Sequence, residues 1–295
     1  MRLLAPTTGI LAFYDGREGK REHDQPNWLD DGALMLGIAS YAIVDRGEAL
    51  VYDTHLSVDR ARWIREQLNA TRITVVLSHR HIDHIAGTEA FADCEVLAGP
   101  LTAKLLGEQR GAIEAATPPV KPLVLPTGEV PPTLQVGTTT VKALAFDIHA
   151  ADHTLLWLPE RRILLAADAV EDPITFVAEP DRIQEHLREL DRLEALDPKI
   201  ILPAHGDPDV IGRRLQRRHH RGDTRLPDRA AGGGQAAARR TPQGPLPQRL
   251  DPPASGLRGG ARAEPQGDRI RVLGRNLVRD PPLQAARLAC REAKG

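Results

Sequence analysis

The segment 79–84 reads His-Arg-His-Ile-Asp-His and follows the apolar run 73–77, which predicts a buried strand. In an extended or turning segment His79 and His81 project to the same side, because side-chain direction repeats every second residue. A turn then brings Asp83 and His84 to a neighbouring point. Imidazole nitrogen and carboxylate oxygen are ligands for zinc and similar ions. The spacing therefore predicts two adjacent metal ions, one on His79 and His81, the other on Asp83 and His84.

The alternative is a polar loop whose histidines have no role. Histidine accounts for only 11 of the 295 residues. A His-x-His-x-Asp-His pattern should therefore arise by chance in roughly one chain of this length per thousand. The metal interpretation is favoured.

Further metal-ligating side chains follow other apolar runs. Asp168 ends the run 163–167, where an unpaired buried carboxylate would be costly. His205 ends the last apolar run, and Gly206 beside it permits a sharp turn. His149 and His153 both follow a strand expected over residues 139–146, and the residues alone do not choose between them.

The segment 79–84 resembles the signature of the metallo-β-lactamase superfamily, and the resemblance covers about the first 210 residues. In that family the third histidine ligand lies ten residues before the Pro of a Leu-Pro-Glu turn, which here is Pro159 and points to His149. The family has Thr-Pro-Gly after that histidine, whereas this chain has Ala-Ala-Asp. The resemblance implies one metal on His79, His81 and His149, a second on Asp83, His84 and His205, and Asp168 bridging them.

The implied activity is hydrolysis of a small-molecule ester, thioester, lactone, amide or phosphodiester by a metal-bridged hydroxide. Two Zn²⁺ ions are expected, with Mn²⁺ or Fe²⁺ as alternatives. Asp83 could also orient the hydroxide or carry its proton, and His153 could donate a proton or contact substrate. The alternative for His153 is a solvated loop histidine. Asp53 either supports the metal site or caps the next helix, and His55 is not expected to be a ligand.

The resemblance implies an αββα fold, two mixed sheets face to face with helices outside. Hydrophobic periodicity alone indicates an α/β chain with two β-rich halves. The loop over residues 117–132 holds six prolines and is a candidate substrate-covering loop. Strands are expected over residues 10–14, 34–44, 48–52, 73–77, 95–98, 133–136, 139–146, 154–158, 163–167 and 200–203, and helices over 57–69, 101–115 and 181–196.

The net charge of −1 conceals a split. Residues 1–212 carry 20 Lys and Arg against 33 Asp and Glu, a balance of −13, and residues 213–295 carry 19 against 7, a balance of +12. Residues 1–212 are expected to form the metal-dependent hydrolase domain. The basic Arg/Pro/Gly-rich tail is expected to be disordered, since it has few apolar groups to bury. A one-base shift in a back-translation of residues 213–226 encodes a turn and a helix start, so a frameshift product is one interpretation of the tail.

Two other functions stay open. A mononuclear iron dioxygenase of the same superfamily would use two His and one Asp of this set on sulfur substrates. A nucleic-acid-binding protein would act through the basic tail, although nucleic acid is not the expected partner. Cys94 and Cys290 form no disulfide framework or metal spacing, and no secretory signal or membrane span is apparent. A cytoplasmic protein is therefore expected, and the sequence does not set its oligomeric state.

Overall fold

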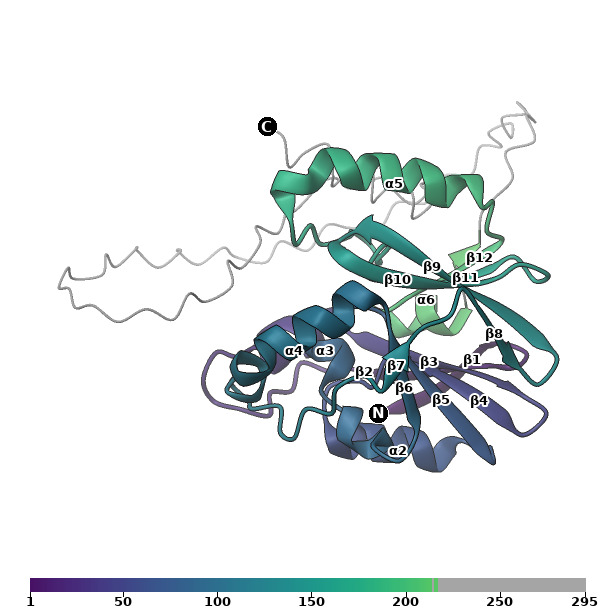
Figure 1. Cartoon of the computed structure of the whole chain (residues 1–295). Coiled ribbons are helices and arrows are strands. Elements are labelled where there is room, and N and C mark those ends of the chain that lie inside the picture. Colours follow the sequence, from purple (N-terminus) through teal and green to yellow (C-terminus); the bar gives the residue numbers. More distant parts are fainter. Residues whose placement is uncertain (214, 217–295) are drawn as a thin grey trace, which may run out of the picture. The chain divides into compact units, whose positions relative to one another are not determined.

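The computed structural model describes residues 1–213 and 215–216 of the chain. The disorder and the alternative reading frame expected for the tail concern residues that lie almost entirely outside this range. The described residues form two β-sheets (Figure 1). The first is a seven-stranded sheet in the order β1-β2-β3-β4-β5-β6-β7. Its strands are β1 (Arg2–Thr7), β2 (Ile10–Asp15), β3 (Ile38–Asp45), β4 (Glu48–Tyr52), β5 (Arg72–Leu77), β6 (Glu95–Ala98) and β7 (Gly128–Glu129).

The second sheet has six strands in the order β13-β12-β11-β10-β9-β8. Both sheets are mixed: β4, β5, β6 and β7 run parallel in the first, and β11 and β12 run parallel in the second. The strands are β8 (Thr133–Val136), β9 (Thr139–Ile148), β10 (Ala150–Leu158), β11 (Ile163–Ala167), β12 (Ile200–Pro203) and β13 (Leu215–Gln216).

Three longer helices cover the sheets, and local sequence explains where they begin. Ser57 caps the first of them, because its side chain accepts a hydrogen bond from the backbone N–H of Arg60. Pro100 opens the second at a position where a helix needs no N–H donor. The helices are α2 (Val58–Gln67), α4 (Pro100–Glu114) and α5 (Ile183–Ala195), with the shorter η1 (Leu29–Ala33), α1 (Leu34–Leu36), α3 (Ile82–Ile85), η2 (Thr88–Phe91), η3 (Pro180–Arg182) and α6 (Pro208–Arg213).

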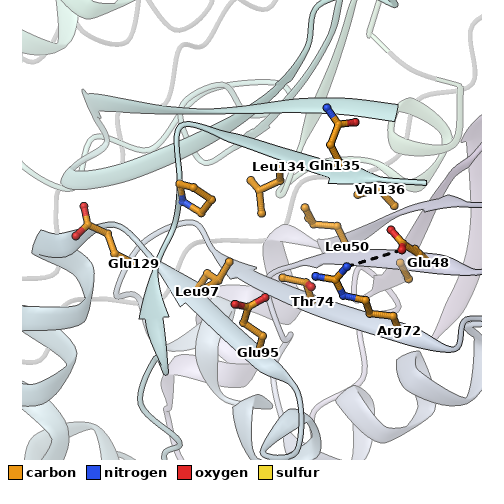
Figure 2. Close-up of a pocket in the computed structure, with 12 residues that line it drawn as sticks. Glu48, Leu50, Arg72, Thr74, Glu95, Leu97, Glu129, Leu134, Gln135 and Val136 are labelled. Atoms are coloured by element: carbon orange, nitrogen blue, oxygen red, sulfur yellow. Dashed lines mark ion pairs between the residues drawn. The ribbon is translucent and has the colours of Figure 1, made fainter. Parts of the chain in front are cut away.

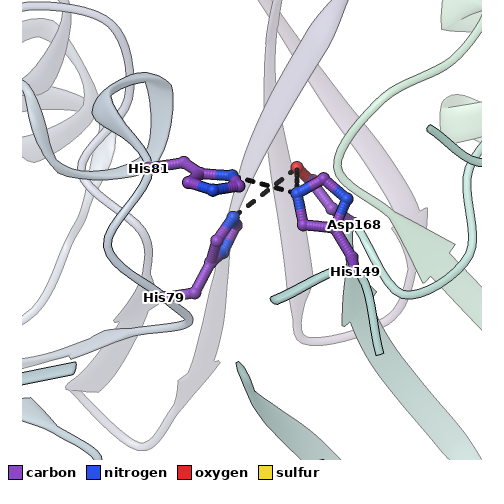
Figure 3. A group of neighbouring side chains, drawn as sticks. All are labelled: His79, His81, His149 and Asp168. Atoms are coloured by element: carbon purple, nitrogen blue, oxygen red, sulfur yellow. Dashed lines mark hydrogen bonds and ion pairs between the residues drawn. The ribbon is translucent and has the colours of Figure 1, made fainter. Parts of the chain in front are cut away.

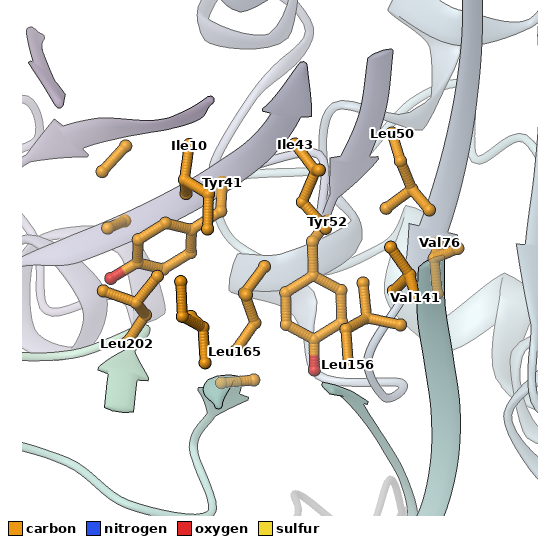
Figure 4. Close-up of a cluster of buried hydrophobic side chains, with 14 of the residues drawn as sticks. Ile10, Tyr41, Ile43, Leu50, Tyr52, Val76, Val141, Leu156, Leu165 and Leu202 are labelled. Atoms are coloured by element: carbon orange, nitrogen blue, oxygen red, sulfur yellow. The ribbon is translucent and has the colours of Figure 1, made fainter. Parts of the chain in front are cut away.

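Alternation of side chains along each strand builds the layers. In β11, Ile163 and Leu165 face the other sheet, and Leu164 and Ala166 face α5. The core between the sheets holds buried tyrosines from the first sheet and branched side chains from both sheets (Figure 4). A second core lies between the first sheet and helices α2 and α4, and a third between the second sheet and α5. The chain is therefore an αββα sandwich, as the resemblance implied.

Four local predictions were wrong. Residues 2–7 form β1, which is not among the expected strands. The strand expected from residue 34 begins at Ile38, because helical turns occupy residues 29–36. β9 and β10 extend to residues 148 and 150, so His153 lies on a strand rather than in a loop. The proline-rich loop contains the short strand β7, which pairs with β6.

Within residues 1–213 and 215–216, the helices are all too short or too polar to cross a bilayer.

Candidate metal centre

The predicted ligands gather at one end of the sandwich, because each follows the carboxyl end of a strand. The segment 79–84 follows β5 and leads into α3, which supplies Asp83 and His84. His149 stands between β9 and β10, Asp168 follows β11, and His205 follows β12. The carboxyl ends of parallel strands meet at one edge of a sheet, where polar sites form. Both sheets therefore contribute to the same cluster.

One group of side chains consists of His79, His81, His149 and Asp168, whose nearest donor atoms all lie within 4.8 Å of one another (Figure 3). His149 Nε2 lies 3.0 Å from His81 Nδ1 and 3.4 Å from Asp168 Oδ2. His79 Nε2 lies 3.7 Å from the same carboxylate oxygen. The geometry gives this group three imidazoles and one carboxylate.

A second group consists of Asp83, His84 and His205. His205 Nε2 lies 3.3 Å from Asp83 Oδ2, and His84 Nε2 lies 3.9 Å from Asp83 Oδ1. Asp168 reaches this group as well, with Oδ2 3.2 Å from His84 Nε2 and Oδ1 3.5 Å from His205 Nε2. Asp168 thus lies between the two groups, in the place expected of a bridging carboxylate.

The outer nitrogens of three histidines are held by acceptors, which fixes the tautomer of each ring. His84 Nδ1 donates to Asp53 Oδ2 at 2.8 Å, His149 Nδ1 to the Phe176 carbonyl at 3.1 Å, and His205 Nδ1 to the Gly37 carbonyl at 3.0 Å. Each Nε2 is thereby directed into the cluster, as in metal-binding histidines. Among the described residues, the buried atoms His79 Nε2 and Asp168 Oδ1 have no hydrogen-bond partner. The donor set and these unpaired atoms fit divalent cations.

Burial and mutual charge set the protonation of the site. Burial lowers the pKa of His79 well below its ordinary value, that of His81 to about 4 and that of His149 to about 3. These rings are neutral at pH 7, as metal ligands must be. Burial alone would also lower the pKa values of His84 and His205. The carboxylates around these rings, Asp168 foremost, outweigh burial and raise both pKa values well above the ordinary value.

Asp53 holds the segment 78–84 in place. It is 2 % exposed, and its Oδ1 accepts the Ser78 N–H at 2.7 Å while its Oδ2 binds His84. Ser57, not Asp53, caps α2. These contacts correspond to the supporting role rather than the capping role considered for Asp53. Its backbone φ of +68° is uncommon for a residue other than glycine, which is typical of functional sites.

Sequence reasoning missed two buried carboxylates near the site. Asp152 Oδ2 accepts the Arg80 backbone N–H at 2.9 Å, and its Oδ1 pairs with the Arg80 guanidinium at 2.7 Å. The chain's departure from Thr-Pro-Gly after His149 therefore supplies an anchor for the loop. Glu171 Oε1 lies 4.0 Å from His149 Nδ1, and burial, then Asp168, raises the pKa of Glu171 to about 8. A second acidic residue three positions after Asp168, beyond the apolar pair at 169–170, was the available signal.

Two other histidines considered in the sequence, His153 as a proton donor or substrate contact and His55 as a residue not expected to be a ligand, lie outside both groups. The ring of His153 is buried, with its centroid 4.8 Å from that of His79 and 6.2 Å from that of His149. Its Nδ1 donates to the Ile148 carbonyl at 2.8 Å. His55 is fully buried in the described structure and joins neither group.

Two cavities in the described part of the chain are lined by residues other than the predicted ligands. A cavity of about 320 Å³ opens at the amino ends of β4, β5 and β6, with Glu48, Arg72 and Glu95 at its rim (Figure 2). It lies at the opposite end of these strands from the histidines. A larger cavity of about 620 Å³ is lined by Trp28, Trp63 and the first part of the proline-rich loop. The substrate-covering role of that loop stays a prediction.

Comparisons with known proteins address the family. The profile of the metallo-beta-lactamase superfamily matches residues 35–205. A search of curated proteins finds no match. Similar solved structures include a metallo-beta-lactamase from Pontibacter korlensis (18 % identity, TM-score 0.55, 70 % of this chain and 91 % of that one).

Two further similar structures have the same fold. One is the metallo-beta-lactamase FIM-1 from Pseudomonas aeruginosa in its mono-zinc form (13 % identity, TM-score 0.52, 70 % and 88 % coverage). The other is a metallo-beta-lactamase family protein from Thermus thermophilus (21 % identity, TM-score 0.50, 71 % and 78 % coverage). At these identities the likeness concerns the fold alone. With its two mixed sheets and the profile match over more than half of its length, this chain belongs to the metallo-beta-lactamase superfamily.

Proposed function

We propose that this protein is a metal-dependent hydrolase with a binuclear centre, loaded with zinc in the first instance. The observation that carries the proposal is the convergence of histidine and aspartate donor atoms from both sheets while the outer histidine nitrogens are held by acceptors. Family membership and the two groups of candidate ligands support a metal-dependent hydrolase in general. The number of ions, their identity and the substrate are our proposals.

The ligands divide into the two groups described above. His79, His81 and His149 would hold one ion, Asp83, His84 and His205 the other, and Asp168 would contact both. Bound divalent cations supply Lewis acidity and lower the pKa of a water molecule, which makes a nucleophile available near neutral pH. A nucleophile of this kind can hydrolyse esters, thioesters, lactones, amides and phosphodiesters.

Two side chains would move protons. The Asp83 side chain is 21 % exposed, whereas those of His84, His205 and Asp168 are at most 4 % exposed. Among these four side chains it is therefore the one best placed to exchange a proton with substrate and solvent. Burial lowers the pKa of His153, and its Nδ1–H is committed to the Ile148 carbonyl. His153 is thus neutral, and its Nε2 is suited to accept a proton rather than to donate one.

The compartment is part of the proposal. Two cysteines far apart in the chain favour a reducing environment, and we place the enzyme in the cytoplasm on that ground.

The test combines metal analysis with a substrate screen. Purified protein loaded with Zn²⁺ or Mn²⁺ is assayed on one model substrate of each class, and its metal content is measured. His81→Ala and Asp168→Ala should abolish hydrolysis and lower the metal content, because each removes a donor. The controls are His23→Ala and Asp45→Ala, which remove a His and an Asp outside both groups.

Two outcomes would contradict the proposal. One is metal-loaded protein that hydrolyses none of the five classes. The other is a single iron per chain together with oxygen uptake on a persulfide, which would identify a dioxygenase of the same superfamily.

A further inference from the structure

A third group of ligand-type side chains lies on the outer side of the second sheet. Asp147 near the end of β9, Glu179 before η3 and His186 in α5 each offer one atom within 4.8 Å of the others. His186 Nε2 lies 3.8 Å from Asp147 Oδ1, which is too long for a hydrogen bond. The group shares no residue with either group of the candidate metal centre.

The His186 imidazole indicates that this group is more than a surface ion pair. Its side chain is 1 % exposed, and its Nε2 has no hydrogen-bond partner among the described residues. A buried polar atom without a partner costs free energy, so an unpaired ring nitrogen directed at two carboxylates needs an explanation. Burial also lowers the pKa of His186, which keeps the ring neutral and its lone pair available.

Two neighbouring arginines, Arg182 and Arg80, balance the negative charge of this group. Arg182 Nε lies 3.2 Å from Asp147 Oδ1, a second guanidinium nitrogen contacts Oδ2, and Nε lies 3.4 Å from Glu179 Oε2. The Arg182 side chain is 42 % exposed and so has room to turn into solvent. Arg80, which pairs with the other Glu179 oxygen at 3.4 Å, is only 14 % exposed. Arg182 is therefore the group that a competing cation would displace.

We propose that Asp147, Glu179 and His186 form an additional binding site for a divalent transition-series cation, Zn²⁺ or Mn²⁺, which replaces the Arg182 guanidinium. One imidazole and two carboxylates suit these ions, whereas an imidazole is a poor ligand for Ca²⁺ or Mg²⁺. Water would complete the coordination on the exposed side. The inference goes beyond the proposed hydrolase activity and does not depend on it.

Contacts of Arg80 link this site to the segment 79–84 of the candidate metal centre. Glu179 contacts Arg80, Arg80 lies between His79 and His81 in the chain, and Asp152 anchors Arg80 from the other side. A cation bound by Glu179 would therefore connect α5 to the loop that carries the predicted ligands. The expected role is to fix that loop, not to take part in hydrolysis.

The test measures metal stoichiometry and affinity with the full chain. Wild type, His186→Gln, Asp147→Asn and Arg182→Gln are dialysed against buffered free Zn²⁺, and bound zinc per chain is determined. Asp181→Asn is the matched control, since it removes a nearby carboxylate outside the group. His186→Gln and Asp147→Asn should bind one equivalent less than wild type, or bind it at least about tenfold more weakly. Asp181→Asn should match wild type.

Arg182→Gln should change the zinc affinity in the opposite direction, so it distinguishes the loss of a ligand from misfolding. Removing the competing guanidinium should tighten binding of the additional equivalent, which a poorly folded variant cannot imitate. Co²⁺ loading gives an independent reading, because the visible spectrum of wild type should contain a component that His186→Gln lacks. Equal stoichiometry and affinity for wild type and His186→Gln would overturn the proposal, as would unchanged or weaker binding in Arg182→Gln.

Discussion

Replacing Asp53 by Asn keeps the shape of a buried side chain but changes one acceptor into a donor. In the structure both Asp53 oxygens accept, one from the Ser78 N–H at 2.7 Å and the other from His84 Nδ1 at 2.8 Å. An amide can satisfy only one of these donors with its oxygen. If it keeps Ser78, its NH₂ faces His84 and favours the tautomer with the proton on Nε2. That proton would then occupy the position from which His84 is predicted to bind metal.

The size of the effect follows from these contacts. Loss of the partner that orients a metal-binding histidine weakens metal binding by about 10- to 100-fold, or about 1.4–2.7 kcal/mol. If the amide turns the other way, the Ser78 N–H loses its acceptor, and a buried donor left unsatisfied costs about 1–3 kcal/mol of unfolding free energy. Either orientation leaves one mismatch, so Asp53→Asn must lose metal affinity, stability or both.

The assay is competition with a chromophoric chelator for zinc, together with thermal melts of metal-free and metal-loaded protein. Asp30→Asn is the matched control: Asp30 is 6 % exposed and accepts the N–H groups of Glu22 and His23, but it bonds none of the predicted ligands. The control should lose stability and keep its zinc affinity. An Asp53→Asn protein with the affinity and melting temperature of wild type would refute the reasoning.

Four other predictions concern Asp30, the histidines at 149 and 153, Asp152 and the tail. Burial alone would raise the pKa of Asp30, but hydrogen bonds from Glu22, Asn27 and His23 outweigh burial and lower this pKa to about 2. A folded pKa below the ordinary value of 3.8 contributes stability that is complete above about pH 5 and is lost as the pH falls toward 2. Acid titrations of Asp30→Asn should lack this component. His149→Ala should lose a metal ion, whereas His153→Ala should keep its metal content and change only the rate or its pH profile, and the reverse result would exchange the two assignments. Asp152→Ala should cost about 3 kcal/mol of unfolding free energy, since it leaves Arg80 without its closest anion, and urea titration measures it. Removal of residues 217–295 should leave metal content and melting temperature unchanged, and a large drop in melting temperature would show that the tail is structural.

The sequence predicted the fold where hydrophobic periodicity was strong. Residues 163–167 form a continuous apolar run, which indicates a buried strand, and the apolar residues of 183–195 recur with the helical period; both elements lie within two residues of the expected bounds. Residues 2–7 were missed because Pro6 and Thr7 end a run of only three apolar residues, and this edge strand is held by pairing with β2. Pairing between distant segments is a tertiary effect, and a local pattern does not report it.

The site was predictable to the extent that its residues were close in sequence. The segment 79–84 contains its own pattern, but the contact between Arg80 and Asp152 joins residues 72 positions apart. Neither side chain has a spacing that would reveal the other. The same holds for the group of Asp147, Glu179 and His186, which forms only when α5 packs on β9. Such groups depend on how the helices and sheets pack together, which a local sequence pattern does not report.

The division of the predicted ligands between two sheets has a consequence for how the chain is cross-linked. Segment 79–84 belongs to the first sheet, and His149, Asp168 and His205 belong to the second. An ion held by both sets would act as a removable cross-link that closes a long loop of the polypeptide, much as a disulfide does in chains that have one. Cys94 is a free thiol in the described part of the chain, so the two sheets would be joined by a bond that a chelator, rather than a reductant, can open.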